Sequence, residues 1–238
     1  MARPVISLPL FVTEKHPCSY LDDEEARSAF INPSFAMTTP IYSELIQQGF
    51  RRSGDDVYSP YCPNCMACIP ARLKVADFIP DRSQKRCRQK NNNTEVLIKP
   101  AEFDLAHYEL YRRYQAARHQ HGVMAQSSQD DYIHFLKSSW CQTAFVEFLI
   151  DGDLAAIAVV DQLENALSAV YTFFDPRLAG YGLGVYAVLW QIEWAKQLKK
   201  DYLYLGYLIK SCRKMSYKDK YQPLQIFRDK KWKLKEPI

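Results

Sequence analysis

Three cysteines at intervals of three residues give this chain its most metal-like spacing. Cys62, Cys65 and Cys68 could present three thiolates from one loop, and Cys18 could supply a fourth. Four thiolates are a ligand set for Zn²⁺ or for an iron–sulfur cluster. The alternative is a group of free thiols, which pack as small apolar side chains. The spacing alone leaves both interpretations open.

Two aspartates stand where a carboxylate could take part in acid–base chemistry. Asp161 ends the run LAAIAVVD, and Asp175 lies in the string FFDP. A carboxylate at the end of a strand can accept a proton from a reacting amine. Such positions are also common for turn and strand-end residues, and that structural role is the simpler interpretation. We keep both residues as candidate catalytic bases.

Cationic side chains that could bind an acidic substrate are spread over both halves of the chain. The planar guanidinium group of arginine matches the two oxygens of a carboxylate better than the ammonium group of lysine does. An ion pair with one of the 27 Asp and Glu side chains is the structural alternative for each arginine. The candidates for substrate binding are Arg51, Arg52, Arg72, Arg82, Arg86, Arg118 and His119.

Positive charge is concentrated in two segments of an otherwise acidic chain. Residues 196–238 hold 13 Lys and Arg against four Asp and Glu, and residues 82–90 hold five cations and no carboxylate. Such segments suit a polyanion, RNA above all, although a solvated surface is the alternative. Cations that alternate with tyrosines can bind phosphates and stack on single-stranded bases. The candidates for such contacts with RNA are Tyr207, Lys210, Arg213, Lys214, Tyr217 and Lys218.

The helices that must position these residues can be predicted from their capping signals. Thr39-Pro40 before an apolar run, with Gly49 after it, predicts a short helix. Carboxylates at the start of 22–31 favour another helix there. Longer helices are expected to begin at Asp104 and Ser128, the second with a capping-box pattern.

The strands are predicted for the second half of the chain. Two β-rich runs flank Asp151-Gly152-Asp153, which indicates a hairpin. A strand over 166–174, a glycine-containing loop, an amphipathic helix and a strand of sequence YLYLGY follow. This order predicts an α/β (α+β) layer with a mainly antiparallel sheet. Because residues 50–100 read as irregular, we expect a small, loop-rich, cysteine-containing N-terminal domain over 1–100 and an α/β domain over 101–238.

Length and composition exclude several classes of protein. A chain of 238 residues with 47% hydrophobic and 24% charged residues is neither disordered nor collagen-like. The longest apolar run, 154–160, is far shorter than the ~20 residues that cross a membrane. We read no signal peptide at the N-terminus, and seven cysteines, an odd number, do not indicate a disulfide scaffold. We therefore expect a reduced, cytoplasmic protein without a membrane partner.

The predicted order of elements resembles the GNAT acyltransferase fold. In that fold a glycine-bearing loop and a helix N-terminus bind the pyrophosphate of coenzyme A through backbone N–H groups. The string RLAGYG at 177–182 matches the loose loop pattern of those enzymes. A coenzyme A-dependent N-acetyltransferase is therefore one interpretation, and a simple chain reversal at this loop is the structural alternative.

Longer strings resemble a particular family. HPCSYL (16–21), GFRRSGD (49–55), YCPNCMACIPAR (61–72) and FIPDRSQKR (78–86) are similar to the N-terminal domain of the arginyltransferases. The bacterial branch of that family, the aspartate/glutamate leucyltransferases, is the closer match. YQAARHQHGVM (114–124), YTFFDP (171–176), LGVYAVLWQIEWA (183–195) and YLGYLIKSCRKMSYKDKYQP (204–223) resemble its C-terminal domain.

The resemblance implies an aminoacyl-tRNA–protein transferase with a GNAT-like catalytic domain. Such an enzyme moves leucine from charged tRNA to the N-terminal amine of a protein that begins with Asp or Glu, which marks that protein for degradation. The transfer requires no cofactor, and the donor amino acid, leucine or arginine, stays open. Related eukaryotic transferases bind metal through cysteines, but Leu21 and Ala67 here replace two of them. A non-catalytic RNA-binding module remains the interpretation from charge alone.

Overall fold

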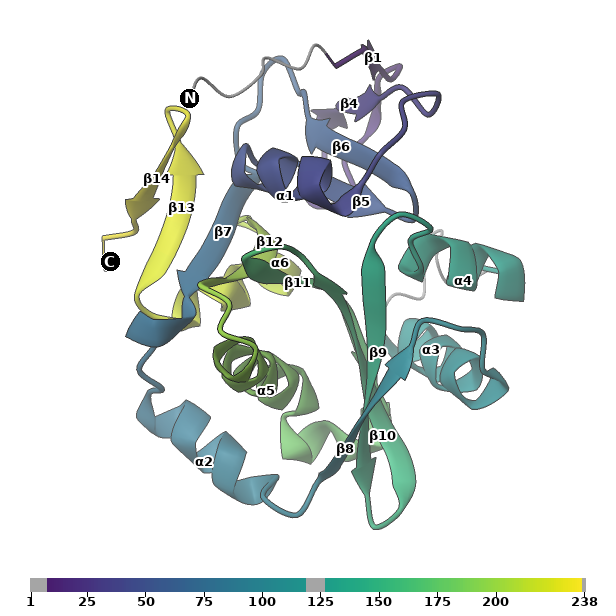
Figure 1. Cartoon of the computed structure of the whole chain (residues 1–238), viewed down its shortest axis with the longest axis vertical. Coiled ribbons are helices and arrows are strands. Elements are labelled where there is room, and N and C mark those ends of the chain that lie inside the picture. Colours follow the sequence, from purple (N-terminus) through teal and green to yellow (C-terminus); the bar gives the residue numbers. More distant parts are fainter. Residues whose placement is uncertain (1–7, 119–126, 237–238) are drawn as a thin grey trace.

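A mixed eight-stranded sheet forms the centre of the computed structural model, which describes residues 8–118 and 127–236 (Figure 1). Its strand order is β14-β13-β7-β12-β11-β10-β9-β8, and the described strands are antiparallel apart from the β11–β12 pair. The mainly antiparallel α/β layer is therefore confirmed. The strands are β7 (Ile69–Lys74), β8 (Glu95–Pro100), β9 (Gln142–Ile150), β10 (Asp153–Gln162), β11 (Ala166–Phe174), β12 (Tyr202–Leu208), β13 (Leu224–Arg228) and β14 (Lys231–Leu234).

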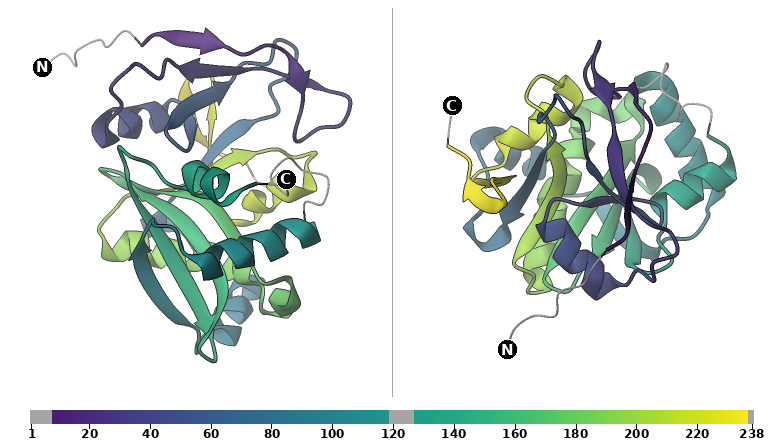
Figure 2. Two further views of the ribbon diagram at one scale, coloured as in Figure 1. Left: turned by 90° about the vertical axis from the view of Figure 1, so that its right-hand side faces the viewer. Right: turned by 90° about the horizontal axis from the view of Figure 1, so that it is seen from above.

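Helices cover both faces of this sheet. Along β10, Ala156, Ala158 and Val160 enter the core that α5 covers, whereas Ile157 and Val159 enter the core under α3 and α4. This alternation follows from strand geometry, in which successive side chains point to opposite faces. Figures 1 and 2 show α2 and α5 on one face and α3 and α4 on the other. The α-helices are α1 (Thr39–Gln47), α2 (Arg82–Lys90), α3 (Leu105–Arg118), α4 (Gln129–Leu136), α5 (Leu183–Gln197) and α6 (Arg213–Ser216), with 3₁₀ turns η1 (Val75–Asp77), η3 (Pro176–Tyr181) and η4 (Tyr217–Lys220).

A smaller antiparallel sheet lies across one end of the large sheet together with α1 (Figure 1). Its order is β1-β4-β6-β5. Ile31, Tyr42 and Val57 of this part share a buried core with Ala166 and Tyr204 of the large sheet. The two sheets therefore pack as one body around a continuous apolar contact. The strands are β1 (Leu10–Val12), β4 (Ser28–Ile31), β5 (Arg51–Ser53) and β6 (Asp56–Pro60), and a separate pair joins β2 (His16–Pro17) to β3 (Glu25–Ala26).

Most predicted elements from residue 104 onward are confirmed. The Asp151-Gly152 turn has φ angles of 53° and 85°, as a tight hairpin turn requires. Ser128 caps α4, and its hydroxyl and backbone exchange hydrogen bonds with Asp131 as the capping box predicts. Thr38, one residue before the predicted cap, caps α1.

Two predictions for the first hundred residues are wrong. Residues 22–31 form strands β3 and β4 in place of a helix, because Ser28–Ile31 pairs with both β1 and β6 and buries alternate side chains. Residues 50–100, expected to be irregular, contain four strands and α2. Tertiary pairing decides both cases and overrides the local capping signals. The division at residue 100 stays a prediction, although β7 and β8 from its first half pair within the large sheet.

Candidate active site

The parallel strands β11 and β12 diverge in the middle of the large sheet. They pair only over Ala166–Ser168 and Tyr202–Tyr204, although β11 continues to Phe174 and β12 to Leu208. A bulge at Val170 accompanies the divergence, because Val159 pairs with Tyr171 but Val160 pairs with Ala169. Bulges bend a strand and leave backbone groups unpaired, and they are frequent next to active sites. The divergence is therefore a candidate substrate-binding site.

The side chain of Arg51 reaches this divergence from the small sheet. Its Nη1 donates to Ser168 Oγ at 3.1 Å, and its Nη2 donates to the carbonyl oxygen of Ala169 at 2.9 Å. Gly206 of β12 lies beside the guanidinium, with an ideal Cβ position 3.6 Å from Nη2. The φ angle of Gly206 is +81°, which favours glycine. Arg51 thus bridges the gap between the two strands.

No carboxylate within residues 8–118 and 127–236 forms an ion pair with Arg51, which is only 8% exposed. Its hydrogen bonds go to a hydroxyl and a carbonyl, which are neutral acceptors. Burying a cation without a counter-ion is costly, so a native structure usually provides one. The positive charge of Arg51 is therefore available to an anionic ligand.

A second buried cation, Lys218, lies beside Arg51. Its Nζ donates to the carbonyl oxygen of Tyr207 at 2.8 Å and lies 3.3 Å from the sulfur of Met215. Burial first, and then the positive charge of Arg51, lower the pKa of Lys218 to about 7. The described residues form no ion pair with this lysine either. The site therefore contains two basic side chains, and neither forms an ion pair with a carboxylate in the described residues.

Three tyrosines lie close enough to Arg51 for its charge to affect them. Burial raises the pKa values of Tyr20, Tyr58 and Tyr217, whereas the charge of Arg51 lowers them in part. For Tyr217 the net result is a pKa of about 12, although the residue as a whole is 40% exposed. These groups are neutral at physiological pH and can donate hydrogen bonds. Sequence analysis missed Tyr20 and Tyr58 as site residues, although Tyr20 lies in the string HPCSYL.

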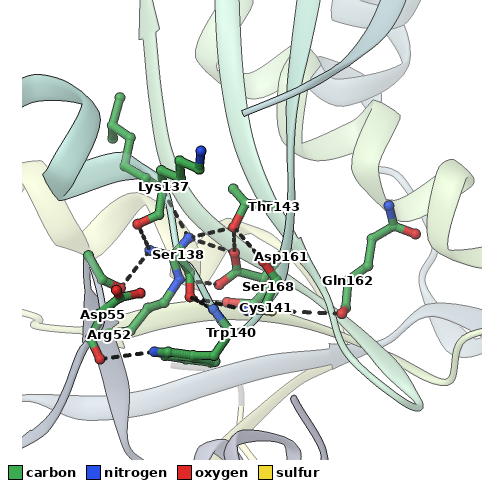
Figure 3. Close-up of polar contacts among 12 residues, drawn as sticks. Arg52, Asp55, Lys137, Ser138, Trp140, Cys141, Thr143, Asp161, Gln162 and Ser168 are labelled. Atoms are coloured by element: carbon green, nitrogen blue, oxygen red, sulfur yellow. Dashed lines mark hydrogen bonds and ion pairs between the residues drawn. The ribbon is translucent and has the colours of Figure 1, made fainter. Parts of the chain in front are cut away.

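Arg52 and Asp161 form a closed ion pair behind this site (Figure 3). Arg52 Nε and Nη2 donate to the two carboxylate oxygens at 2.7 and 2.6 Å, and Thr143 Oγ1 donates to the same carboxylate at 2.8 Å. Both side chains are buried, with exposures of 1% and 0%. Further Arg52 N–H groups bind the carbonyls of Gly54 and Leu136. The pair joins β5 of the small sheet to β10 of the large sheet, which is a structural role.

Asp175 is also held by an arginine. It accepts from Nε and Nη2 of Arg177 at 3.0 and 2.6 Å, and Arg113 lies 3.7 Å away. The hydrogen bonds from Arg177 hold the pKa of Asp175 below its usual value despite some burial. Asp175 borders a pocket of about 450 Å³ between α3 and η3. Neither candidate base is therefore a free carboxylate at the strand divergence.

The other predicted substrate-binding arginines lie apart from Arg51. Arg72 is stacked between the rings of Tyr202 and Trp232, with its guanidinium carbon 3.8 and 4.2 Å from the ring centres. It also donates to Gln225 and to the hydroxyl of Tyr204, which gives it a structural role at the β7–β12–β13 edge. Arg82 and Arg86 are exposed on α2, and Arg118 lies 5.6 Å above the ring of Phe174. His119 falls outside the described residues.

Two of the six predicted tRNA-binding residues are buried. Tyr207 is 4% exposed and donates to the carbonyl of Gly49 at 3.0 Å, so its ring cannot stack on a base. Lys218, also 4% exposed, cannot reach a phosphate on the surface. Neither side chain is available for contacts with phosphates or bases at the surface. The remaining residues of that set are exposed: Lys210, Arg213, Lys214 and Tyr217.

The four predicted metal-binding cysteines share one region of the molecule. Burial first, and then the nearby thiols of Cys18, Cys62 and Cys65, raise the pKa of Cys68 to about 12. No three His, Cys, Asp or Glu side chains in the described ranges are gathered closely enough to hold a metal ion. The zinc or iron–sulfur site stays a prediction.

Two family models place the chain in a class of transferases. A family model described as "Arginine-tRNA-protein transferase, N terminus" matches residues 16–86, and the model for the C terminus of the same family matches residues 106–228. The chain belongs to this arginine-tRNA-protein transferase family. Its N-terminal and C-terminal parts thus correspond to the two regions that the family combines.

Curated relatives identify a branch of this family to which the chain is similar. The protein named aspartate/glutamate leucyltransferase from Saccharophagus degradans is 47% identical over 94% of this chain and 96% of its own length. Those of Alcanivorax borkumensis and Pseudomonas aeruginosa are 48% and 47% identical, over 95% and 94% of this chain and over 94% and 96% of their own lengths.

Solved structures show a partial likeness. The structure of L-PGS from Bacillus licheniformis aligns with 60% of this chain and 45% of its own, at 12% identity and a TM-score of 0.46. A conserved protein of unknown function from Bacteroides thetaiotaomicron aligns with 66% of this chain and 56% of its own, at 12% identity and a TM-score of 0.45. Among the helices of the described ranges, none has the length and apolar character needed to cross a membrane.

Proposed function

We propose that this chain transfers leucine from leucyl-tRNA to the N-terminal amine of proteins whose first residue is Asp or Glu. The observation that carries this proposal is the similarity, at 47% identity over 94% of the chain, to relatives named aspartate/glutamate leucyltransferase. Such a modification would mark the acceptor for degradation. Both substrates are cytoplasmic, which is the location we propose for the enzyme.

We assign the catalytic part to the GNAT-like class of acyltransferases. Three features support this assignment: the parallel pair β11–β12 that diverges after three residue pairs, the bulge at Val170, and the glycine-containing turn that leads into α5. In this arrangement the acyl donor would lie in the divergence, where strand backbone groups are free to bind it. The donor here is an aminoacyl ester in place of acyl-coenzyme A.

The proposed reaction needs neutral amine and stabilisation of negative charge. The ester is already activated, so the amine can attack its carbonyl carbon directly. An amide C–N bond forms, the ester C–O bond breaks, and the proton lost by the nitrogen passes to the departing 3′ oxygen of the tRNA. A free α-amino group has a pKa of ~7.7–8.0 and is often protonated at neutral pH. The charges of Arg51 and Lys218 would lower the pKa of an amine placed beside them. The same charges would stabilise the oxyanion that forms on the ester carbonyl.

Acceptor recognition is assigned to Arg51. Its guanidinium has no internal counter-ion among the described residues, and a carboxylate is the ligand that its planar fork fits best. An acceptor that begins with Asp or Glu would supply the missing negative charge. Asp161 and Asp175 are not used as bases in this proposal, because both carboxylates are already bound by arginines.

The donor tRNA is assigned to the exposed segment that follows β12. Its side chains could bind the phosphates and stack on the bases of the single-stranded CCA end. No cofactor enters the proposed transfer. The residues proposed for this contact are Lys210, Arg213, Lys214 and Tyr217.

A transfer assay with purified protein tests the proposal. Radiolabelled leucyl-tRNA is offered with peptides that differ only in their first residue, Asp, Glu or Ala. We expect label on the Asp and Glu peptides and little on the Ala peptide. Parallel reactions with arginyl-tRNA and with acetyl-coenzyme A test the two other donors. Transfer that requires acetyl-coenzyme A and ignores tRNA would falsify the proposal.

A further inference from the structure

Helix α2 carries a continuous row of cations on its outer side. Arg82, Lys85 and Arg86 are exposed and have neither a hydrogen bond nor an ion pair with any side chain in the described ranges. Residues three and four apart lie on one side of a helix, so these three side chains are neighbours. Arg88 and Lys90 extend the positive surface, although they also contact Glu193 and the carbonyl of Gly180.

The opposite side of α2 fixes this row rigidly against the fold. Gln84 is buried, completes a capping box with Asp81, and donates to the carbonyl of Lys220 at 3.1 Å. Asn91 donates through its side-chain amide to the carbonyl of Tyr181 at 2.8 Å. The Cys87 thiol contacts the carbonyl of Gly182, directly before α5. The row is therefore held beside the glycine-containing turn that leads into α5.

We propose that the outer side of α2 binds the phosphate backbone of the double-stranded acceptor stem of the donor tRNA. This inference rests on the proposed function and adds a surface to it. Helix α2 presents cations but no aromatic side chain, so it can bind phosphates but cannot stack on unpaired bases. A duplex offers phosphates at regular intervals and hides its base faces, which is the partner that such a row fits.

The same row does not suit the acidic acceptor. Arg82 and Arg86 lie on α2, which Figure 1 shows far from β5, the strand that carries Arg51. A single N-terminal carboxylate needs one convergent site, whereas three cations spread over more than one helical turn match a repeating polyanion. We therefore reassign Arg82 and Arg86 from the acceptor to the donor.

Steady-state kinetics of a triple variant, Arg82→Gln, Lys85→Gln and Arg86→Gln, tests this surface. We expect the KM for leucyl-tRNA to rise at least about tenfold at physiological salt, and the slope of log KM against log salt to fall by about 2–3. The KM for the Asp peptide should change less than twofold. With a leucyl-CCA fragment as donor, which has no duplex, the variant should match the unmodified protein.

A matched control removes the same charge elsewhere. The triple variant Arg228→Gln, Lys230→Gln and Lys231→Gln lies at the exposed tip of the β13–β14 hairpin, away from α2 (Figure 1). It should leave the KM for leucyl-tRNA within about twofold. Both variants should melt within about 2 °C of the unmodified protein, because the changed side chains are exposed.

Two outcomes would overturn the inference while leaving the proposed transfer intact. One is an unchanged KM and salt slope for leucyl-tRNA in the α2 variant, which would assign this row to solvent. The other is an increase confined to the KM for the peptide, which would return Arg82 and Arg86 to the acceptor. Absence of leucine transfer by the unmodified protein would instead refute the proposed function.

Discussion

Arg51 and Arg52 are neighbours on one short strand, yet only Arg52 forms an ion pair within the described residues. Adjacent strand residues point to opposite sides, so the two guanidinium groups enter different environments. Both reach the row of residues that runs across β9, β10 and β11, where Thr143, Asp161 and Ser168 are paired neighbours. Arg52 meets the one carboxylate in that row, and Arg51 meets the hydroxyl. One cation is neutralised inside the fold and the other is not.

The difference separates a structural region from a functional one. The Arg52–Asp161 region satisfies its charges with its own groups, so it holds the two sheets together and offers nothing to a ligand (Figure 3). The Arg51–Lys218 region leaves Arg51 and, in its protonated form, Lys218 buried without an ion pair in the described residues. Such a region lowers the stability of the free protein, and binding of an anion would relieve this cost. Substitutions in the two regions should therefore have opposite signatures.

The largest effect is expected from Asp161→Asn. This change leaves the buried Arg52 guanidinium without its counter-ion, which costs about 3–5 kcal/mol in a buried pair. Urea unfolding at pH 7 measures the loss. The double variant Arg52→Met with Asp161→Leu removes both charges and should recover most of the stability. A loss below about 1 kcal/mol for Asp161→Asn would show that the pair does not hold the sheets together.

Arg51→Met should lower activity and leave stability nearly unchanged. The loss of activity corresponds to a smaller free energy than the loss of stability in Asp161→Asn. The Arg51→Met variant loses the cation that we assign to the acidic acceptor, so kcat/KM for the Asp peptide should fall about 100-fold. Its free energy of unfolding should change by less than about 1 kcal/mol, because lost hydrogen bonds are offset by removal of an unneutralised buried charge.

Arg51→Lys is the control for this change, since it keeps the charge but loses the planar fork. It should retain part of the activity and the preference for acidic first residues. If Arg51→Met kept its preference for Asp over Ala, acceptor recognition would have to lie elsewhere.

The contrast between these arginines could not be predicted from the sequence. The string GFRRSGD presents two adjacent arginines, and nothing local tells which one will meet Asp161, more than one hundred residues later. The elements after residue 104 were predictable because their signals are local: a capping box at Ser128 and a turn at Asp151-Gly152. Strand pairing between distant segments has no such local signal, which is why 22–31 was expected to be helical.

Burial likewise separates the cations of the basic C-terminal segment into exposed and inward-facing side chains. Spacing grouped Lys218 with Lys214 and Arg213, but the turn η4 directs Lys218 inward to the carbonyl of Tyr207. An amphipathic pattern could not have revealed this, because a lysine is normally read as exposed. Arg51, which we propose for the acceptor, was among the candidates from the sequence, whereas Lys218 was grouped with the exposed cations of its segment.

The smallest expected effect is the pH dependence of stability that Lys218 causes. The pKa of Lys218 is lowered to about 7 by burial and then by Arg51, against ~10.4 in an unfolded chain. Between these values the unfolded chain binds one more proton, so this lysine makes stability rise with pH by up to about 1.4 kcal/mol per pH unit. Below pH 7 the lysine is protonated in both states, so the free energy by which it destabilises the folded protein is constant.

The test compares the unmodified protein with Lys218→Met by urea unfolding at pH 7.5 and 8.5. Arg51 from β5, Cys68 before β7, and Cys212 before α6 face the amine, and all three are present in both proteins. Their contributions therefore cancel in the difference. The stability of the unmodified protein relative to the variant should increase by about 1 kcal/mol over this step, because only the contribution of the lysine differs between the two proteins. Identical pH profiles would mean that the pKa of Lys218 is the same in the folded and unfolded protein, so that burial of this lysine carries no cost and Arg51 alone accounts for the cost of the region.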